Sequence, residues 1–266
     1  QVRQIMNRSL DSAAAAAKFI GRGAPVDDWQ ALEPAELVML ATSDSALGAC
    51  ASRLATSGAL APGTIVFHCS GASAVETLAP VERAGAQIAR LHALRSFASP
   101  ERAVPTFRGT YCGLEGHPDA VRVLEGLVRA CGGRPFPMPA AGAVFYHAAA
   151  VLVSNYLVAL VDAGLRCSAY AGIEPGEANA MLRGLVTSTL DNVFEVGTTA
   201  ALTGPIARGD VEVVRTQLEA LSVADPELAD AYRALGILAV DLSERQASAP
   251  PESLVQMRRL LEAVRK

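Results

Sequence analysis

Short apolar runs alternate with amphipathic stretches along the first half of the chain, up to about residue 139. The apolar runs have the length of buried strands, and the stretches between them repeat their apolar positions at helical spacing. Strands are predicted at residues 2–6, 36–41, 64–68, 87–91, 110–114 and 134–137, and helices at 11–20, 45–57 and 118–131. Apolar strands that alternate with helices predict a parallel sheet covered by helices on both faces.

The second half carries a different pattern, in which strand-like runs disappear and helical periodicity continues from residue 141. Helices are predicted at residues 141–171, 174–196, 210–221, 226–243 and 251–264. Gly172 and Pro175 separate the first two, because glycine often ends a helix and proline often begins one. We therefore predict a Rossmann-like α/β domain over residues 1–139 and an all-α domain over residues 140–266.

One polar loop interrupts the helical half, with the sequence ALTGPIARGD at residues 201–210. Its glycine–proline pair breaks the helix, and the carboxylate of Asp210 is predicted to cap the helix that follows. A polar loop between long helices also offers groups to a ligand, so Thr203, Arg208 and Asp210 are candidate substrate-binding residues. The alternative is a helix–helix connection with a good N-cap, which explains most of these residues without a ligand.

The composition, 51% hydrophobic and 19% charged over 266 residues, is that of a globular protein with a sizeable core. A net charge of −4 leaves no basic footprint for nucleic acid. We expect charged residues to interrupt every apolar run before it reaches the length of a membrane span. The five cysteines are scattered and lack a C-x-x-C pair, which favours reduced thiols in a cytoplasm over disulfides or zinc.

Residues that follow the first predicted strand are candidates for cofactor binding, because open parallel sheets bind ligands at the carboxyl ends of their strands. Arg8 is placed to pair with the 2′-phosphate of NADP, with Asn7 and Ser9 as hydrogen-bonding partners. A capped helix N-terminus beside a surface arginine explains the same three residues without a cofactor.

Small polar residues also follow the next two predicted strands. Thr42 and Ser43 come after the second strand, and His68, Ser70 and Gly71 end or follow the third. At the carboxyl edge of a sheet these residues can line a dinucleotide. The alternatives are a helix cap after the second strand and an ordinary strand-to-helix turn after the third.

Three further side chains fall where the two halves of the chain should meet. His92 follows a predicted strand, His147 lies near the start of the long helix, and Asn155 lies eight residues later on roughly the same face. A buried asparagine in an apolar helix needs hydrogen-bonding partners, either another helix or a substrate. Each histidine taken alone is more often structural, and no H-x-x-x-H spacing indicates a metal.

The segments Asn7-Arg8-Ser9, ELVMLATSD, IVFHCSGA, ARLHALRSFASPERA, FYHAAAVLVSNYLVAL and ALTGPIARGD follow one another in this order along the chain. With them the chain resembles a family assigned as NADP-dependent oxidoreductases, in which a Rossmann-like domain precedes a helical domain of uncharacterised function. That family lies in the 6-phosphogluconate dehydrogenase-like superfamily, with ketopantoate reductase and the β-hydroxyacid dehydrogenases as relatives. The resemblance covers essentially the whole chain.

The chain departs from that pattern at two points. The first strand and glycine-rich turn of a dinucleotide-binding domain do not precede the first predicted strand, so we expect them to have been omitted or truncated. The β-hydroxyacid dehydrogenases carry a helical Lys-x-x-x-Asn pair whose lysine is the acid and base. Here Asn155 matches the asparagine, but Val151 occupies the lysine position. Their mechanism therefore does not transfer to this chain.

Together these observations predict a cytoplasmic oxidoreductase that moves a hydride between NADP(H) and a small carbonyl or imine-type substrate. We expect His147 to be the proton donor, with His92 as the alternative, and Asn155 to orient the substrate. A non-catalytic dinucleotide sensor is one alternative function, and a purely structural helical dimer is another. The two long helices at 141–171 and 174–196 are apolar around much of their circumference, which predicts a homodimer through the helical half.

Overall fold

The computed structural model describes residues 1–138 and 140–263. The chain divides into two compact units, Gln1–Asn155 and Tyr156–Lys266, which are described in turn. The first unit contains all the strands of the described residues, and the second contains helices.

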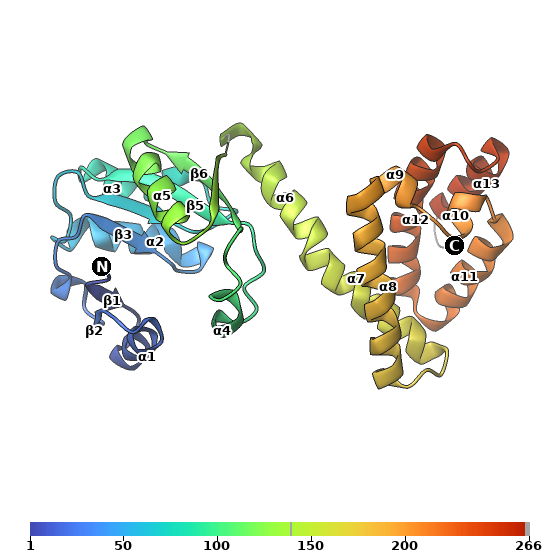
Figure 1. Cartoon of the computed structure of the whole chain (residues 1–266), viewed down its shortest axis with the longest axis horizontal. Helices are drawn as coiled ribbons and strands as arrows, with labels where there is room; N and C mark the ends of the chain where they lie inside the picture. Colours follow the sequence, from blue (N-terminus) through green and yellow to red (C-terminus); the bar gives the residue numbers. More distant parts are fainter. Residues whose placement is uncertain (139, 264–266) are drawn as a thin grey trace. The chain divides into compact units, whose positions relative to one another are not determined.

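A five-stranded sheet forms the centre of the first unit (Figure 1), in the order β3-β4-β5-β6-β7. Its strands are β3 Leu37–Leu40, β4 Ile65–His68, β5 Gln87–Ala93, β6 Tyr111–Gly116 and β7 Arg134–Pro137. The predicted parallel arrangement is confirmed for β3, β4 and β5, whereas β6 runs antiparallel to β5. The only α-helix in the β5–β6 connection is the short α4, Pro100–Ala103. A parallel neighbour usually needs a helix that crosses the sheet, as α5 does between β6 and β7, and a four-residue helix is too short for this.

A separate two-stranded parallel sheet pairs β1 Gln4–Met6 with β2 Ala24–Val26, joined through α1 Leu10–Ile20. Side-chain hydrogen bonds tie β1 to the loop before β3. Gln4 donates to the Ala31 carbonyl at 2.9 Å and accepts from the Glu33 amide at 2.8 Å.

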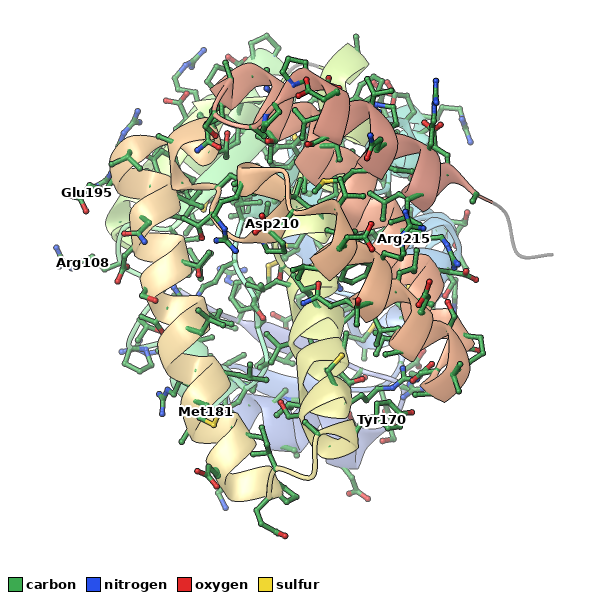
Figure 2. The ribbon with its side chains drawn as sticks, turned by 90° about the vertical axis from the view of Figure 1, so that its right-hand side faces the viewer. Arg108, Tyr170, Met181, Glu195, Asp210 and Arg215 are labelled. Atoms are coloured by element: carbon green, nitrogen blue, oxygen red, sulfur yellow. The ribbon has the colours of Figure 1, made fainter. Side chains whose placement is uncertain are left out.

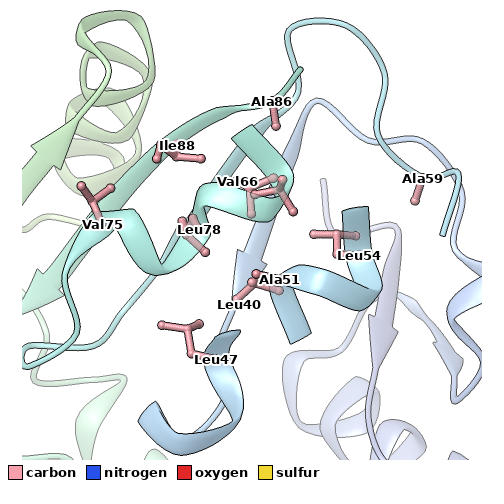
Figure 3. Packing of buried hydrophobic residues seen from close by; sticks show 11 residues of the cluster. Leu40, Leu47, Ala51, Leu54, Ala59, Val66, Val75, Leu78, Ala86 and Ile88 are labelled. Atoms are coloured by element: carbon pink, nitrogen blue, oxygen red, sulfur yellow. The ribbon is translucent and has the colours of Figure 1, made fainter. Parts of the chain in front are cut away.

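Helices cover both faces of the five-stranded sheet. One face packs on α2 Asp44–Thr56 and on the consecutive turns η2 Val75–Leu78 and α3 Ala79–Arg83, and the other packs on α5 Pro118–Ala130. Successive residues of β4 point to opposite faces, so Val66 joins the α2 side shown in Figure 3, and Phe67 joins the α5 side. This alternation confirms the predicted α/β layers.

The second unit is helical, as predicted. A long helix leads into it, assigned as α6 Ala143–Val153 and α7 Asn155–Tyr170 on either side of a distortion at Ser154. It is followed by α8 Pro175–Val196, α9 Thr198–Ala201, α10 Pro205–Arg208, α11 Val211–Ala224, α12 Pro226–Gln246 and α13 Pro251–Glu262. The apolar core of this unit lies mainly among α11, α12 and α13. The side chains of α7 and α8 lie mostly outside it, as Met181 on α8 illustrates (Figure 2).

The long helix Ala143–Tyr170 overturns one expectation, because its 28 residues are long and apolar enough to cross a membrane. Its first nineteen residues contain polar side chains but no Asp, Glu, Lys or Arg, so the predicted interruption by charge was wrong. Asn155 was expected to be buried in this helix and is exposed. Asn155 is exposed because few described residues of the chain cover the helix.

Candidate functional site

Two histidines, His92 near the carboxyl end of β5 and His147 in α6, meet beside Gly71 in the turn after β4. This glycine is buried three residues after β4. A Cβ atom added there would lie 2.6 Å from Nε2 of His92 and 2.7 Å from Nδ1 of His147. Glycine therefore permits the close approach of both rings, and His147 lies beside the turn that carries Gly71. We call Gly71, His92, His147 and Tyr146, described next, the imidazole cluster.

Tyr146, one residue before His147, completes this cluster. Its hydroxyl is hydrogen-bonded to Nδ1 of His92 at 2.9 Å, and the two rings meet edge-on with centroids 5.5 Å apart. On its other side the Tyr146 ring packs against Phe136 of β7 at 5.9 Å. Two strands therefore hold Tyr146 in place, and the hydrogen bond fixes the orientation of His92.

The second ring of the cluster has a free nitrogen. Nδ1 of His147 is buried, and no group in the described parts of the chain hydrogen-bonds to it. The His92 and His147 rings lie 6.1 Å apart by their centroids. A buried polar atom without a partner is costly, so this nitrogen is available to a bound molecule.

His68, the last residue of β4, is fully buried next to this cluster. Burial, and secondarily the positive charge of Arg90, lowers its pKa from 6.5 to about 4. Its Nδ1 accepts a hydrogen bond from the Ser70 amide at 3.2 Å. His68 is thus neutral near pH 7, and its hydrogen bond with Ser70 stabilises the turn after β4.

Burial also lowers the pKa of His92, and the neighbouring His147 and Arg90 lower it further, while Asp44 acts in the opposite direction. Asp44 is the exposed first residue of α2. The net result is that the His92 ring is mainly uncharged near pH 7. An uncharged imidazole can donate through one nitrogen and accept through the other.

Arg90 of β5 is a buried cation that was not among the predicted site residues. It forms an ion pair with Glu115, its partner across the β5–β6 ladder, and donates to the Ser73 carbonyl at 3.0 Å. A signal existed in the sequence, because an arginine inside an apolar strand needs a buried anion. Arg90 links the turn after β4 to β6 and sets the positive potential around His68 and His92.

The candidates after β1 are only partly free to bind a cofactor. The Ser9 hydroxyl caps α1 by accepting from the Ser12 amide at 3.3 Å, and the Asn7 side chain accepts from the Arg8 amide at 2.9 Å. The helix cap proposed as the alternative is therefore present. Arg8 itself is exposed, and no ion pair involves it within the described ranges.

The candidates after β3 and β4 occupy turns. Thr42 and Ser43 are exposed, and Ser43 is the N-cap residue of α2, with its hydroxyl 3.2 Å from that of Ser45. The Ser70 hydroxyl accepts from the amides of Ala72 at 3.1 Å and Ser73 at 2.8 Å. Ser70 therefore builds the turn that carries Gly71.

The three candidate substrate residues lie in the second unit, whereas the imidazole cluster lies in the first. Asp210 precedes α11 but does not cap it with its side chain, so that prediction was wrong. Its carboxylate instead pairs with Nε of Arg208 at 2.9 Å. Thr203 is exposed in the same loop. The competing arginine explains why the carboxylate does not reach the helix.

Comparison with known families identifies both halves of the chain. A model of a Rossmann-like domain matches residues 2–93, and a model described as a domain of unknown function, DUF2520, matches residues 110–238. The chain thus joins a Rossmann-like domain to a DUF2520 domain. The first matched region holds Gly71 and His92, and the DUF2520 region holds Tyr146 and His147, so the imidazole cluster is assembled from both. No curated protein sequence matches the chain.

Solved structures share this fold over nearly the whole chain. A Thermotoga maritima protein, TM1727, is 25% identical, with a TM-score of 0.70 and coverage of 91% of this chain and 90% of that one. A Bacteroides fragilis protein provisionally described as an NADP oxidoreductase is 20% identical, with a TM-score of 0.75 and coverage of 92% and 89%. An imine reductase from Pseudomonas sp. is 18% identical, with a TM-score of 0.59 and coverage of 95% and 89%. The predicted fold, a Rossmann-like domain followed by a helical domain, is confirmed.

Proposed function

We propose that this protein is a cytoplasmic NADP(H)-dependent oxidoreductase that acts on a small carbonyl or imine-type substrate. The observation that carries the proposal is the imidazole cluster, in which His92 and His147 face one point at the carboxyl edge of a Rossmann-like sheet. Ligands bind at this edge in open α/β sheets. Two imidazoles there provide the proton donors that reduction of a carbonyl or imine requires.

The residues along the same edge fit a nicotinamide dinucleotide. Gly71 lets both imidazoles approach the turn after β4, and the exposed Thr42 and Ser43 keep the neighbouring turn small and polar. Arg8 offers an exposed cation for the 2′-phosphate. When bound, such a cofactor supplies the hydride. The protein's part is to hold the acceptor atom of the substrate against the imidazole nitrogens and to deliver a proton to it.

Turnover of NADPH with a panel of small ketones, aldehydes and cyclic imines tests this function. His147→Ala is expected to lower kcat about 10²-fold, because one positioned acid or base contributes at least that factor. His117→Ala is the matched control, since His117 is half exposed and pairs with Glu82 at 2.9 Å outside the cluster. NADPH binding without turnover of any substrate would contradict the proposal and favour a dinucleotide sensor.

Arg8 is expected to set the cofactor preference. A charge-assisted contact with the 2′-phosphate contributes about 1.5–3 kcal/mol, which corresponds to a preference of about ten-fold or more for NADPH over NADH. Arg8→Ala should remove most of that preference, whereas Arg22→Ala, at the other end of α1, should retain it. Calorimetric titration with both cofactors provides the measurement, and equal affinities in the parent protein would refute this role.

We also propose a homodimer built on the long helices α7 and α8. Their apolar side chains are widely exposed, with Val158 at 71% and Phe194 at 85%. Charged residues such as Asp162 and Arg166 interrupt this surface, which disfavours lipid as its cover. A second copy of the same helices matches the mixed pattern under two-fold symmetry.

Light scattering at micromolar concentration is expected to give the mass of a dimer. Val158→Asp should shift the protein towards the monomer, because a carboxylate in an apolar interface lacks a partner. Val223→Asp is the control, since Val223 is 88% exposed at the end of α11 and outside the proposed interface. A monomeric parent protein would rule out this assembly.

A further inference from the structure

The Tyr146–His92 hydrogen bond constrains which nitrogen of His92 carries a proton. A phenol is a much stronger acid than the N–H of a neutral imidazole, so the favoured bond has the Tyr146 hydroxyl donating to Nδ1. The ring proton then sits on Nε2. This is the nitrogen that faces the Gly71 turn, where the opposing His147 nitrogen has no partner among the described residues.

We infer that Tyr146 is the source of the proton in the proposed reaction and passes it through His92. The inference rests on the proposed function and adds a positioning residue to the same site. As hydride reaches the carbonyl carbon, the C=O electron pair moves to oxygen, which takes the proton from Nε2 of His92. The Tyr146 O–H bond breaks as a new N–H bond forms at Nδ1. His92 ends neutral and Tyr146 ends as tyrosinate, which regains a proton from solvent.

The charge that His92 would otherwise carry favours this relay over donation by His92 alone. A neutral imidazole that lost its Nε2 proton without replacement would become a high-energy anion. The protonated ring is scarce near pH 7, because burial, His147 and Arg90 lower the pKa of His92 and only Asp44 raises it. Burial raises the pKa of Tyr146, with Cys112 acting in the same direction and Arg90 against it, so the hydroxyl stays protonated.

The tautomer can be measured directly, without any turnover. The chain has four histidines, so long-range ¹⁵N–¹H spectra of labelled protein are simple to assign by single substitutions. We expect His92 with Nε2 protonated in the parent protein and a mixture of tautomers in Tyr146→Phe. Tyr111→Phe is the matched control, because Tyr111 belongs to the same aromatic row and its hydroxyl accepts from Arg134 at 3.2 Å. An Nδ1-protonated His92 in the parent would overturn the inference.

Kinetics separate this relay from a merely structural role of Tyr146. Tyr146→Phe is expected to lower kcat about 10²-fold while leaving the KM for NADPH unchanged. The parent rate should be flat around neutral pH, whereas the residual rate of Tyr146→Phe should rise as pH falls, because donation by His92 then requires its protonated ring. Parental kcat in Tyr146→Phe would overturn the relay alone. Absence of turnover in the parent would instead contradict the proposed function, and the relay with it.

Discussion

Replacing Gly71 with alanine is expected to abolish most NADPH-dependent turnover. The new Cβ would approach Nε2 of His92 to 2.6 Å and Nδ1 of His147 to 2.7 Å, so at least one ring must move. His92 cannot turn away freely, because Tyr146 holds its Nδ1. Displacing the proton donors by about an ångström lowers kcat about 10²-fold. Overpacking should also reduce the free energy of unfolding by about 1–3 kcal/mol.

A glycine in open space gives the control for this substitution. Gly126 lies within α5, and a Cβ there meets no atom within 4 Å. Gly126→Ala should keep the parental kcat and raise stability by up to about 1 kcal/mol, because alanine favours the helix. If Gly71→Ala also kept the parental kcat, the two imidazoles would not converge on this turn in solution.

Glu115→Ala should cause a large loss of stability in the first unit. Arg90 is 1% exposed and forms its ion pair with Glu115 across the β5–β6 ladder. Removing one partner leaves a buried charge without compensation, which costs about 3–5 kcal/mol. Among the described hydrogen bonds, only the one to the Ser73 carbonyl would then remain for the Arg90 side chain.

The single tryptophan makes this loss measurable in a two-unit protein. Trp29 packs against the core on the α2 side of the sheet, so its fluorescence in a urea titration reports unfolding of the first unit. Glu125→Ala removes an exposed i,i+4 pair with Arg129 and should change stability by about 0.5 kcal/mol or less. Equal effects of the two substitutions would mean that the Arg90–Glu115 pair is solvated.

The layers of the first unit could be predicted because burial on both faces leaves continuous apolar runs such as Ile-Val-Phe in β4. Two features escaped prediction for identifiable reasons. β2 has three residues and contains Pro25, which argues against a strand. The direction of β6 depends on the path of the β5–β6 connection. An apolar run shows that a segment forms a strand, but it does not show whether that strand is parallel or antiparallel to its neighbour.

The candidate site was predictable in part. His147 was a candidate because it falls where the two halves of the chain were expected to meet. Tyr146 was missed because its role arises from a contact with His92, 54 residues away, which no local pattern encodes. Asp210 was misassigned because a neighbouring arginine competed for its carboxylate. Local motifs thus supplied the candidate residues, and long-range contacts decided which of their atoms face one another.

The residues proposed for cofactor preference and for proton transfer lie next to two separate sheets. Arg8 follows the two-stranded sheet, which Gln4 ties by its side chain to the loop before β3, whereas His92 belongs to the five-stranded sheet. Substitutions around Arg8 therefore touch none of the hydrogen bonds that orient His92. During evolution, or in protein engineering, the choice between the two nicotinamide cofactors can change through a few exposed positions while the buried proton-transfer residues are kept.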